Sequence, residues 1–393
     1  SSTVAITMRT AVIAVIVILW ANVRAENNRS DVKINIACDV SEDETYLSPP
    51  EQFLSPNTEI IYTVSGKRGT LLKLLCNVSL DCSVGSYVAV AGKDKEYGPY
   101  CSNFQLKQFH PDKMRIRMFS GYGKPILSQN YNCEIKCSMC SCGKPLHSRV
   151  IGGKAVDGVS PWNLVILSYQ GEESYIYPMC GATMLSPNFA MTAAHCTQDL
   201  SIKDVLLYGN SNKLFSSNGV YIPIASIRDH PGYNKKTFEN DISILELMEP
   251  LDVSPSMMPV CLPFKHIDHK FEGHSANYSG WGSTIYGGVS VDQLQIVEVN
   301  VTSNEECLNM MGKNIFETSI CTRGEPGKSA SKGDSGGPLV FKDESSIHFQ
   351  IGIVSWSEGF GTYDKFGVST RVTSYLSWIL DNAPDICVPA DSL

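Results

Sequence analysis

Three short motifs of the chain carry residue types that could together form a nucleophilic site. His195 lies in a Thr-Ala-Ala-His-Cys run, Asp241 begins Asp-Ile-Ser-Ile-Leu, and Ser335 lies in Gly-Asp-Ser-Gly-Gly-Pro. A serine hydroxyl is a poor nucleophile at neutral pH and needs a base that takes its proton. His195 could take that proton and return it to a leaving amine, while Asp241 holds the imidazole in the required tautomer. The three residues therefore predict acyl transfer through Ser335.

Glycines surround the candidate nucleophile and would let the backbone turn sharply there. The backbone amides of Gly333 and Ser335 could then point at a developing oxyanion. One such donor is typically worth roughly 3 kcal/mol of barrier. Taken singly, the motifs have plainer interpretations: a glycine-rich turn, a core histidine and a surface aspartate. Their combination, in this order, favours the catalytic interpretation.

The segment from Val150 to near Ala383 resembles the chymotrypsin and trypsin (S1) family of serine proteases. Besides the three motifs, the resemblance rests on Ser279-Gly280-Trp281-Gly282, on Ser355-Trp356 and on Tyr375-Leu376-Ser377-Trp378-Ile379. It implies an all-β fold of two six-stranded antiparallel barrels with the triad between them. It also implies a C-terminal helix, and the apolar spacing i, i+3, i+4 at Leu376, Ile379 and Leu380 agrees with one.

The run Arg149-Val150-Ile151-Gly152-Gly153 resembles the activation site of the same family. The resemblance implies a zymogen that is cleaved after Arg149. The new α-amine of Val150 would then pair with the carboxylate of Asp334, which directly precedes Ser335, and would order the oxyanion loop.

The substrate pocket implied by the resemblance differs from that of trypsin. Ser329 stands where trypsin has an aspartate, and an uncharged floor cannot offset the desolvation of a buried cation. Gly367 leaves depth, whereas Ser357 narrows the mouth. These positions predict a preference for uncharged, apolar side chains before the cut, and therefore a separate protease as activator. The predicted pocket residues are Ser329, Ser355, Trp356, Ser357 and Gly367.

A second unit, residues 31–136, precedes the protease region. Short stretches at 59–64, 71–75, 86–91 and 115–119 alternate with turn residues, which predicts a small β-sandwich held by disulfides. The unit resembles a CUB domain. The residues that carry this resemblance are Tyr46–Pro50, Cys82, Tyr87–Val90, Tyr100-Cys101, Met114–Met118 and Tyr131–Cys133. The whole arrangement, with a linker and activation segment at 137–149 and the protease domain at 150–393, resembles secreted arthropod proteases of venom, saliva and haemolymph.

Fourteen cysteines indicate an oxidising compartment. The resemblance leaves Cys38 without its expected partner, and Cys38, Cys137, Cys140 and Cys387 allow three pairings. The pairs implied by the resemblance are Cys180–Cys196, Cys307–Cys321, Cys142–Cys261, Cys82–Cys101 and Cys76–Cys133.

The N-terminal residues 1–25 read as a short upstream stretch followed by a secretory signal peptide. Met8 is the expected start, and the apolar run that follows is shorter than the roughly 20 residues of a membrane-spanning helix. We therefore predict a secreted protein without a membrane anchor. Four sequons agree with secretion, and their asparagines are Asn28, Asn77, Asn277 and Asn300.

The remaining features argue for a protease without a cofactor. We expect no metal site, because no pair of cysteines or histidines completes a zinc-ligand set with Cys137 and Cys140. The net charge of −8 argues against nucleic acid as a partner. The expected partners are protein or peptide substrates, an activating protease and a ligand of the CUB-like unit. The alternative is a binding protein in which that unit recognises a partner and the protease domain serves as a scaffold.

Overall fold

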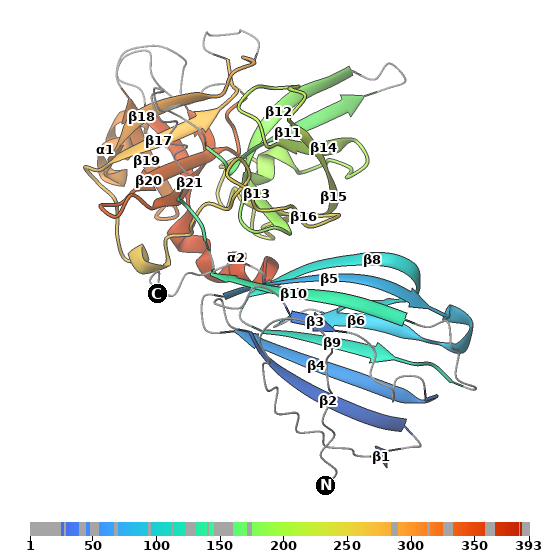
Figure 1. Ribbon diagram of the computed structural model, residues 1–393. Helices are drawn as coiled ribbons and strands as arrows, with labels where there is room; N and C mark the ends of the chain where they lie inside the picture. The colour runs from blue at the N-terminus through green and yellow to red at the C-terminus, as the bar shows by residue number, and fades with distance from the viewer. Residues whose placement is uncertain are drawn as a thin grey trace, which may run out of the picture. The chain divides into compact units, whose positions relative to one another are not determined.

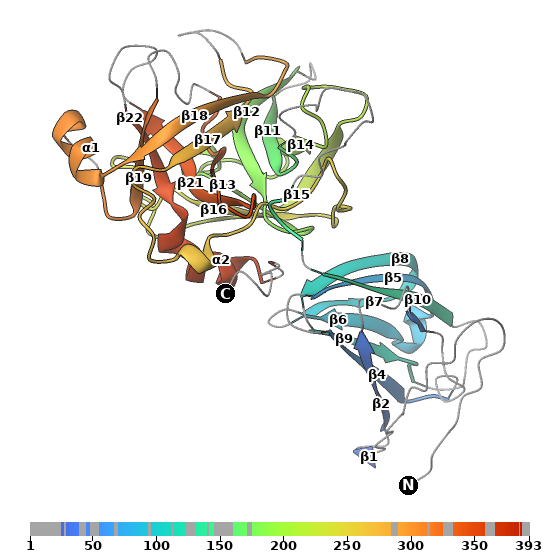
Figure 2. The same ribbon diagram turned by 60° about the vertical axis from the view of Figure 1, so that its left-hand side comes forward.

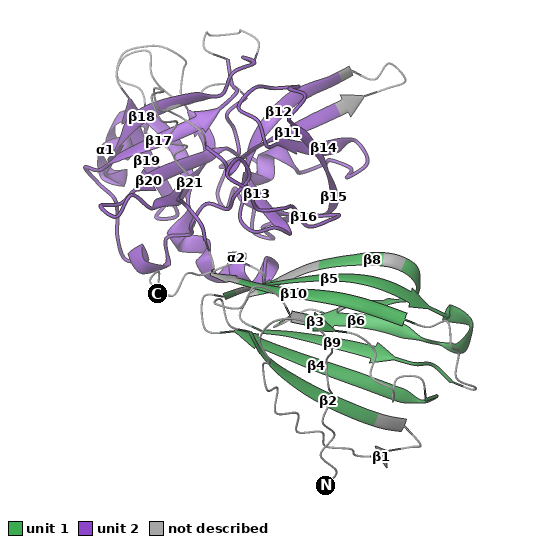
Figure 3. Cartoon of the chain, in the orientation of Figure 1, with its two compact units in different colours: residues 1–140 green, residues 141–393 purple. Residues whose placement is uncertain are grey.

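The computed structural model divides the chain into two compact units, residues 1–140 and 141–393 (Figure 3). The residues that lie outside the described part of the chain include 1–24 of the predicted signal segment, Asn28, Cys140, Arg149, Val150, Ser329 and Cys387. The structure describes residues 25–26, 29–38, 45–47, 55–66, 70–92, 96–111, 113–122, 130–139, 141–144, 160–170, 175–283, 290–312, 315–324, 333–357, 366–384 and 386.

Unit 1 consists of two sheets. One sheet has the order β1-β2-β4-β9-β6-β7 and the other β3-β10-β5-β8; β2 and β4 pair in parallel and the other neighbours are antiparallel (Figure 1). The strands are β1 (Ala25–Glu26), β2 (Arg29–Cys38), β3 (Thr45–Leu47), β4 (Thr58–Gly66), β5 (Thr70–Leu80), β6 (Tyr87–Ala91), β7 (Glu96–Tyr100), β8 (Ser102–Pro111), β9 (Lys113–Phe119) and β10 (Asn130–Met139), with a short 3-10 turn at Cys82–Val84.

Side-chain alternation explains these strands. In β9, Met114, Ile116 and Met118 are fully buried, whereas Arg115 between them and Lys113 before them are exposed. Buried side chains of both sheets join one core. The four stretches predicted from the sequence all fall in strands, namely β4, β5, β6 and β9, so the expected disulfide-bonded β-sheet region is confirmed.

Among its described residues, unit 1 is held together by three disulfides. Cys76 and Cys133 are opposite each other on β5 and β10, and Cys82 pairs with Cys101. Cys38, for which the resemblance offered no partner, pairs with Cys137 and joins β2 of one sheet to β10 of the other. Closing a chain loop this long commonly contributes about 2–5 kcal/mol to a small secreted domain.

Unit 2 contains two closed six-stranded barrels, as the sequence predicted, followed by the expected C-terminal helix (Figures 1 and 2). The first barrel is β11 (Asn163–Gln170), β12 (Tyr175–Met184), β13 (Phe189–Thr192), β14 (Val205–Gly209), β15 (Val220–Asp229) and β16 (Ser243–Leu247). The second is β17 (Ser275–Gly280), β18 (Gln295–Thr302), β19 (Ser319–Gly324), β20 (Pro338–Lys342), β21 (His348–Ser357) and β22 (Phe366–Arg371).

Two α-helices occur in the described part of unit 2, α1 (Asn304–Met311) and α2 (Leu376–Asn382). Within the described residues, neither has the length and hydrophobicity needed to cross a bilayer. The buried face of α2 consists of Leu376 and Ile379, which belong to the core of the first barrel. Three disulfides link Cys142 to Cys261, Cys180 to Cys196 and Cys307 to Cys321, the pairs that the family resemblance implies.

Candidate functional site

His195 and Asp241 are in direct contact in the first barrel. His195 lies on the 3-10 turn Ala194–Cys196 that follows β13, and its backbone N–H donates to Asp241 Oδ1 over 2.8 Å. The imidazole Nδ1 lies 2.7 Å from Asp241 Oδ2. Because an ionised carboxylate can only accept, Nδ1 is the donor of this contact, and in the neutral imidazole Nε2 then keeps its lone pair. This is the tautomer in which Nε2 can act as a base.

The carboxylate of Asp241 is fully buried and is held from both barrels. Ser355 on β21 donates its hydroxyl to Asp241 Oδ2 over 2.6 Å, and Thr370 on β22 donates to the backbone carbonyl of Asp241 over 2.7 Å. The carboxylate therefore has three donors, namely the backbone N–H and the ring of His195 and the hydroxyl of Ser355. A buried negative charge without such donors would be costly.

The residue before Asp241 fixes the backbone at this point. Asn240 has a φ of 57°, in the left-handed region that asparagine tolerates better than most residues. Its side-chain amide donates to the carbonyl of Gly232, and its Oδ1 accepts from the hydroxyl of Tyr375, near the start of α2. The 3-10 turn Val372–Tyr375 that leads into the C-terminal helix therefore supports the position of the aspartate.

The loop that carries Ser335 is pressed against the first barrel. Gly181 N–H donates to the carbonyl of Ser335 over 2.7 Å. Gly336 has a φ of 77°, and a Cβ there would lie 2.1 Å from Thr192 Oγ1, three residues before His195. Only glycine fits such an approach. The serine loop and the histidine segment are thereby brought together across the two barrels.

Asp334 lies against the Gly-Trp-Gly turn after β17. Gly282 N–H donates to Asp334 Oδ1 over 2.9 Å. A Cβ on Gly280 would come within 2.2 Å of the same oxygen, and one on Gly282 within 2.6 Å of the carboxylate. A side chain at either glycine of the turn would therefore displace the Asp334 carboxylate from its present position.

Ser335 is half-buried, and its hydroxyl makes no hydrogen bond to another described residue. Nucleophile–base contacts are often longer without substrate than in the reacting complex. His195 Nε2 lies 3.5 Å from Cys196 Sγ, and the ring of Phe238 meets the His195 ring edge-on at 5.7 Å. Gly333, the second predicted oxyanion donor, has a φ of 99°.

A polar pair deep in the structure joins the two barrels. Asn163 on β11 donates from Nδ2 to the carbonyl of Ser279 over 3.0 Å, and the Ser279 hydroxyl donates back to Asn163 Oδ1 over 2.8 Å. Both residues are buried. Reciprocal bonds of this kind fix the register of one barrel on the other.

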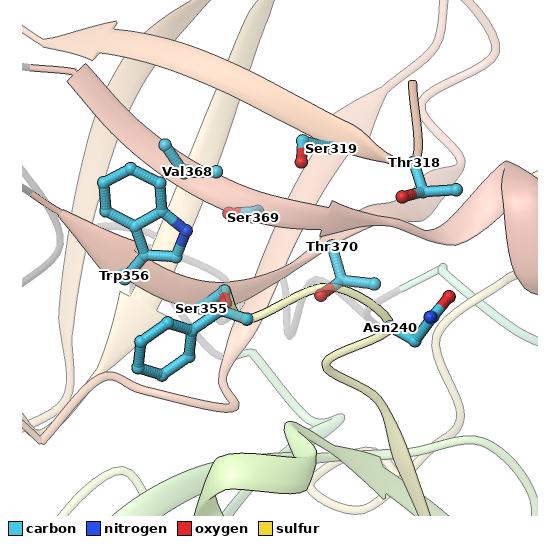
Figure 4. A pocket seen from close by; sticks show the side chains of 9 residues that line it. Asn240, Thr318, Ser319, Ser355, Trp356, Val368, Ser369 and Thr370 are labelled. Carbon is cyan, nitrogen blue, oxygen red and sulfur yellow. The ribbon is translucent and has the colours of Figure 1, made fainter. Parts of the chain in front are cut away.

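A small pocket opens beside the His195–Asp241 pair. Figure 4 shows Trp356, Ser355, Val368 and Asn240 around it. Three of the predicted pocket residues, Ser355, Trp356 and Ser357, are the last residues of β21. Gly367 lies on β22 and is paired with Ser357. The full lining is Phe238, Asn240, Thr318, Ser319, Ser355, Trp356, Val368, Ser369 and Thr370.

The surroundings of the site do not suit a metal ion. Among the described residues, the one group of potential ligands within reach of each other is Cys180, His195 and Cys196. The two cysteines form a disulfide, so neither offers a thiolate.

Near the site, burial and the negative charges of Asp241 and Asp229 raise the pKa of Tyr233, which stays a neutral phenol.

Three sequon asparagines lie in the described chain. Asn77 on β5 and Asn300 on β18 are exposed, whereas Asn277 on β17 is half-buried. Residues of the site that the sequence did not point to are Phe238, Thr318 and Thr370. Their contribution depends on contacts between segments far apart in the chain, for which a single sequence holds no local signal.

Comparison with known proteins gives one family match, which lies within unit 2. The trypsin family model matches residues 150–379. Trypsin delta of Drosophila melanogaster is 36% identical over 243 residues, which cover 61% of this chain and 90% of that protein. Venom serine protease Bi-VSP of Bombus ignitus is 35% identical over 252 residues, covering 60% and 69%. Mannan-binding lectin serine protease 1 of Rattus norvegicus is 31% identical over 269 residues, covering 63% and 37%.

Proposed function

Because the chain belongs to the trypsin family of serine endopeptidases through residues 150–379, we propose that His195, Asp241 and Ser335 form its catalytic triad. The observation that carries this proposal is the bonding of Asp241. The carboxylate accepts from the His195 ring and backbone and from Ser355, which leaves His195 Nε2 as the available base. A binding protein with a scaffolding protease domain has no need for this arrangement.

In the proposed reaction the Ser335 hydroxyl oxygen attacks the scissile carbonyl carbon, and His195 Nε2 takes the hydroxyl proton. The backbone amides of Gly333 and Ser335 stabilise the oxyanion of the tetrahedral intermediate. His195 then gives the proton to the leaving amine as the peptide C–N bond breaks. Water attacks the resulting ester through the same base, which releases the acid product and restores Ser335.

Activation is proposed to require cleavage after Arg149. The free α-amine of Val150 would approach Asp334, whose carboxylate already lies at the turn of Gly280 and Gly282 beside the serine loop. A buried ion pair there would order the loop that carries Gly333 and Ser335. The disulfide Cys142–Cys261 would keep both chains joined after cleavage.

The pocket is proposed to accept uncharged, apolar side chains before the cut. The neutral residue Ser329 supports this preference, because a buried lysine or arginine without a counter-charge costs several kcal/mol. An enzyme of this preference cleaves poorly after Arg149, so the activator is a different protease.

Unit 1 is proposed to be a CUB-like domain that binds a protein partner. The disulfides of this unit support secretion of the protein.

The test uses a serine-directed fluorophosphonate probe on the secreted full-length protein. We expect labelling after cleavage by a separable trypsin-like protease, and no labelling of the Ser335→Ala variant. The Arg149→Gln variant should be secreted and folded but should stay unlabelled after the same treatment. Labelling of uncleaved Arg149→Gln to the wild-type level would contradict the activation step, and failure to label cleaved wild-type protein would contradict the triad.

A further inference from the structure

The space that a side chain on Gly367 would enter is already occupied by other residues, although a glycine at this position alone predicts an open, deep pocket. A Cβ built on Gly367 would lie 3.0 Å from Thr322 Oγ1 and 3.1 Å from Tyr278 Oη. Both contacts are tighter than ordinary van der Waals distances. The volume next to this proposed pocket wall is therefore filled by two hydroxyl groups from other strands.

Tyr278 reaches this position from β17 and is held there by two strands. Its hydroxyl lies 2.9 Å from Thr322 Oγ1 and 3.0 Å from Ser369 Oγ. Thr322 on β19 is directly opposite Gly367 on β22, and Ser369 follows Gly367 by two residues. In a strand, residues two apart and residues directly opposite share a face. The phenol therefore ends on the same face of the sheet as the missing side chain of Gly367.

The three hydroxyls form a closed, neutral cluster. Two hydrogen bonds join Tyr278 to its neighbours, and Thr322 Oγ1 also lies 3.4 Å from the Gly367 carbonyl, so each hydroxyl proton has a partner. Burial raises the pKa of Tyr278, so the phenol stays protonated. Tyr278, Thr322 and Ser369 are each almost completely buried. The cluster adds bulk without adding a charge.

We propose that Tyr278 is a specificity-determining residue that shortens the substrate pocket next to Gly367, so that medium-sized aliphatic side chains fit better than aromatic ones. This inference rests on the proposed function, because it assumes that Gly367 lines the pocket of an active protease. With Tyr278 in this position, the pocket is shallower than Gly367 alone would predict. The preferred substrates are peptides with leucine or valine before the cut.

The test compares matched peptides that differ only in having leucine or phenylalanine before the cut. Active-site titration with the fluorophosphonate probe normalises each preparation, and the readout is the ratio of kcat/KM for phenylalanine to that for leucine. Wild-type enzyme should favour leucine. Tyr278→Val should raise the ratio about tenfold or more, since one extra or missing methylene in a hydrophobic pocket already changes kcat/KM by about 10- to 200-fold. Tyr278→Phe keeps the ring and should leave the ratio within about threefold.

Tyr278→Leu serves as a second enlarging variant if Tyr278→Val does not fold, and both keep the Asn-x-Ser sequon. Tyr208→Phe is the matched control, because it removes a buried phenol hydroxyl in the first barrel. An unchanged ratio in the enlarging variants, or a wild-type preference for phenylalanine, would overturn the role of Tyr278 alone. Wild-type protein that neither labels nor hydrolyses either peptide would overturn the proposed function, and this inference with it.

Discussion

Ser355 donates a 2.6 Å hydrogen bond to Asp241 Oδ2, the same oxygen that faces the His195 ring. The serine comes from the second barrel and the aspartate from the first, so this bond sets the direction of the carboxylate across the junction. Hydrogen bonds to a charged acceptor commonly contribute about 1.5–3 kcal/mol.

Ser355→Ala should therefore lower kcat by roughly tenfold, while two bonds from His195 still hold Asp241. KM for a small amide substrate should change less than kcat, because the lost bond orients the base although Ser355 also lines the pocket. Steady-state kinetics on activated enzyme measures both, and Ser374→Ala, at an exposed position, is the control. A variant with unchanged kcat would show that the two bonds from His195 suffice to orient Asp241.

Ser329→Asp should move the preference of the pocket towards lysine and arginine before the cut. The new carboxylate supplies the counter-charge that a buried cation needs. Hydrolysis of matched peptides ending in leucine and arginine measures the shift, and we expect the arginine-to-leucine ratio of kcat/KM to rise by at least about tenfold. If the wild-type enzyme already cleaves the arginine peptide best, an acidic group other than residue 329 serves the pocket.

Asn163→Ala should destabilise unit 2, because it leaves the buried carbonyl and hydroxyl of Ser279 without their partner. The expected loss is about 1–3 kcal/mol in the free energy of unfolding. Urea unfolding followed by tryptophan fluorescence reports on unit 2, since residues 25–140 contain no tryptophan. Asn218→Ala, at an exposed loop position, should unfold like wild type. Equal midpoints for both variants would mean that the barrels are held by other contacts.

The stability of unit 1 should fall as the pH is lowered from about 6.5 towards 4. Burial lowers the pKa of His110 to about 4, whereas an unfolded histidine titrates near 6.5. The unfolded state therefore binds the proton first, and the stabilisation present above about pH 6.5 is lost through this window, by at most roughly 3 kcal/mol. His110 is the one histidine of residues 25–140, which isolates its effect above the range of the carboxylates.

Differential scanning calorimetry of the full chain measures this effect. The calorimetric transition of unit 1 is identified as the one that is not accompanied by a change in tryptophan fluorescence, because residues 25–140 contain no tryptophan. Its midpoint should drop between pH 6.5 and 5 in wild type and stay nearly level in His110→Leu. A wild-type midpoint that is flat over this interval would contradict a buried neutral imidazole.

Local patterns predicted strands of unit 1, whereas the two barrels and the C-terminal helix were implied by the family that the motifs of unit 2 resemble. The alternation of β9 and the apolar spacing of α2 are visible in the sequence, as are the motifs around His195, Asp241 and Ser335. Helix α1 was missed although its signals are present: Ser303 accepts from the N–H of Glu306, and Gly312 ends the helix with a φ of 75°. A serine followed three residues later by glutamate marks a helix start.

Long-range contacts could not be predicted in this way. Tyr278 and Ser369 are 91 residues apart, and Tyr375 and Asn240 are 135 apart. Each pair meets because separate strands or helices pack together, and neither residue of a pair carries a local mark of its partner. The parallel pairing of β2 with β4 has the same origin, since strand neighbours in a sheet follow from tertiary packing.

Each barrel is built from one continuous stretch of chain, residues 163–247 for the first and 275–371 for the second. His195 and Asp241 belong to the earlier stretch and Ser335 to the later one. During synthesis all strands of the first barrel are made before the second, so they can begin to pair earlier, although Leu376 and Ile379 complete their core only at the end. A half-folded chain would thus hold the base without the nucleophile. Assembly order would keep the nascent protein chemically inert inside the cell, separately from any control by cleavage.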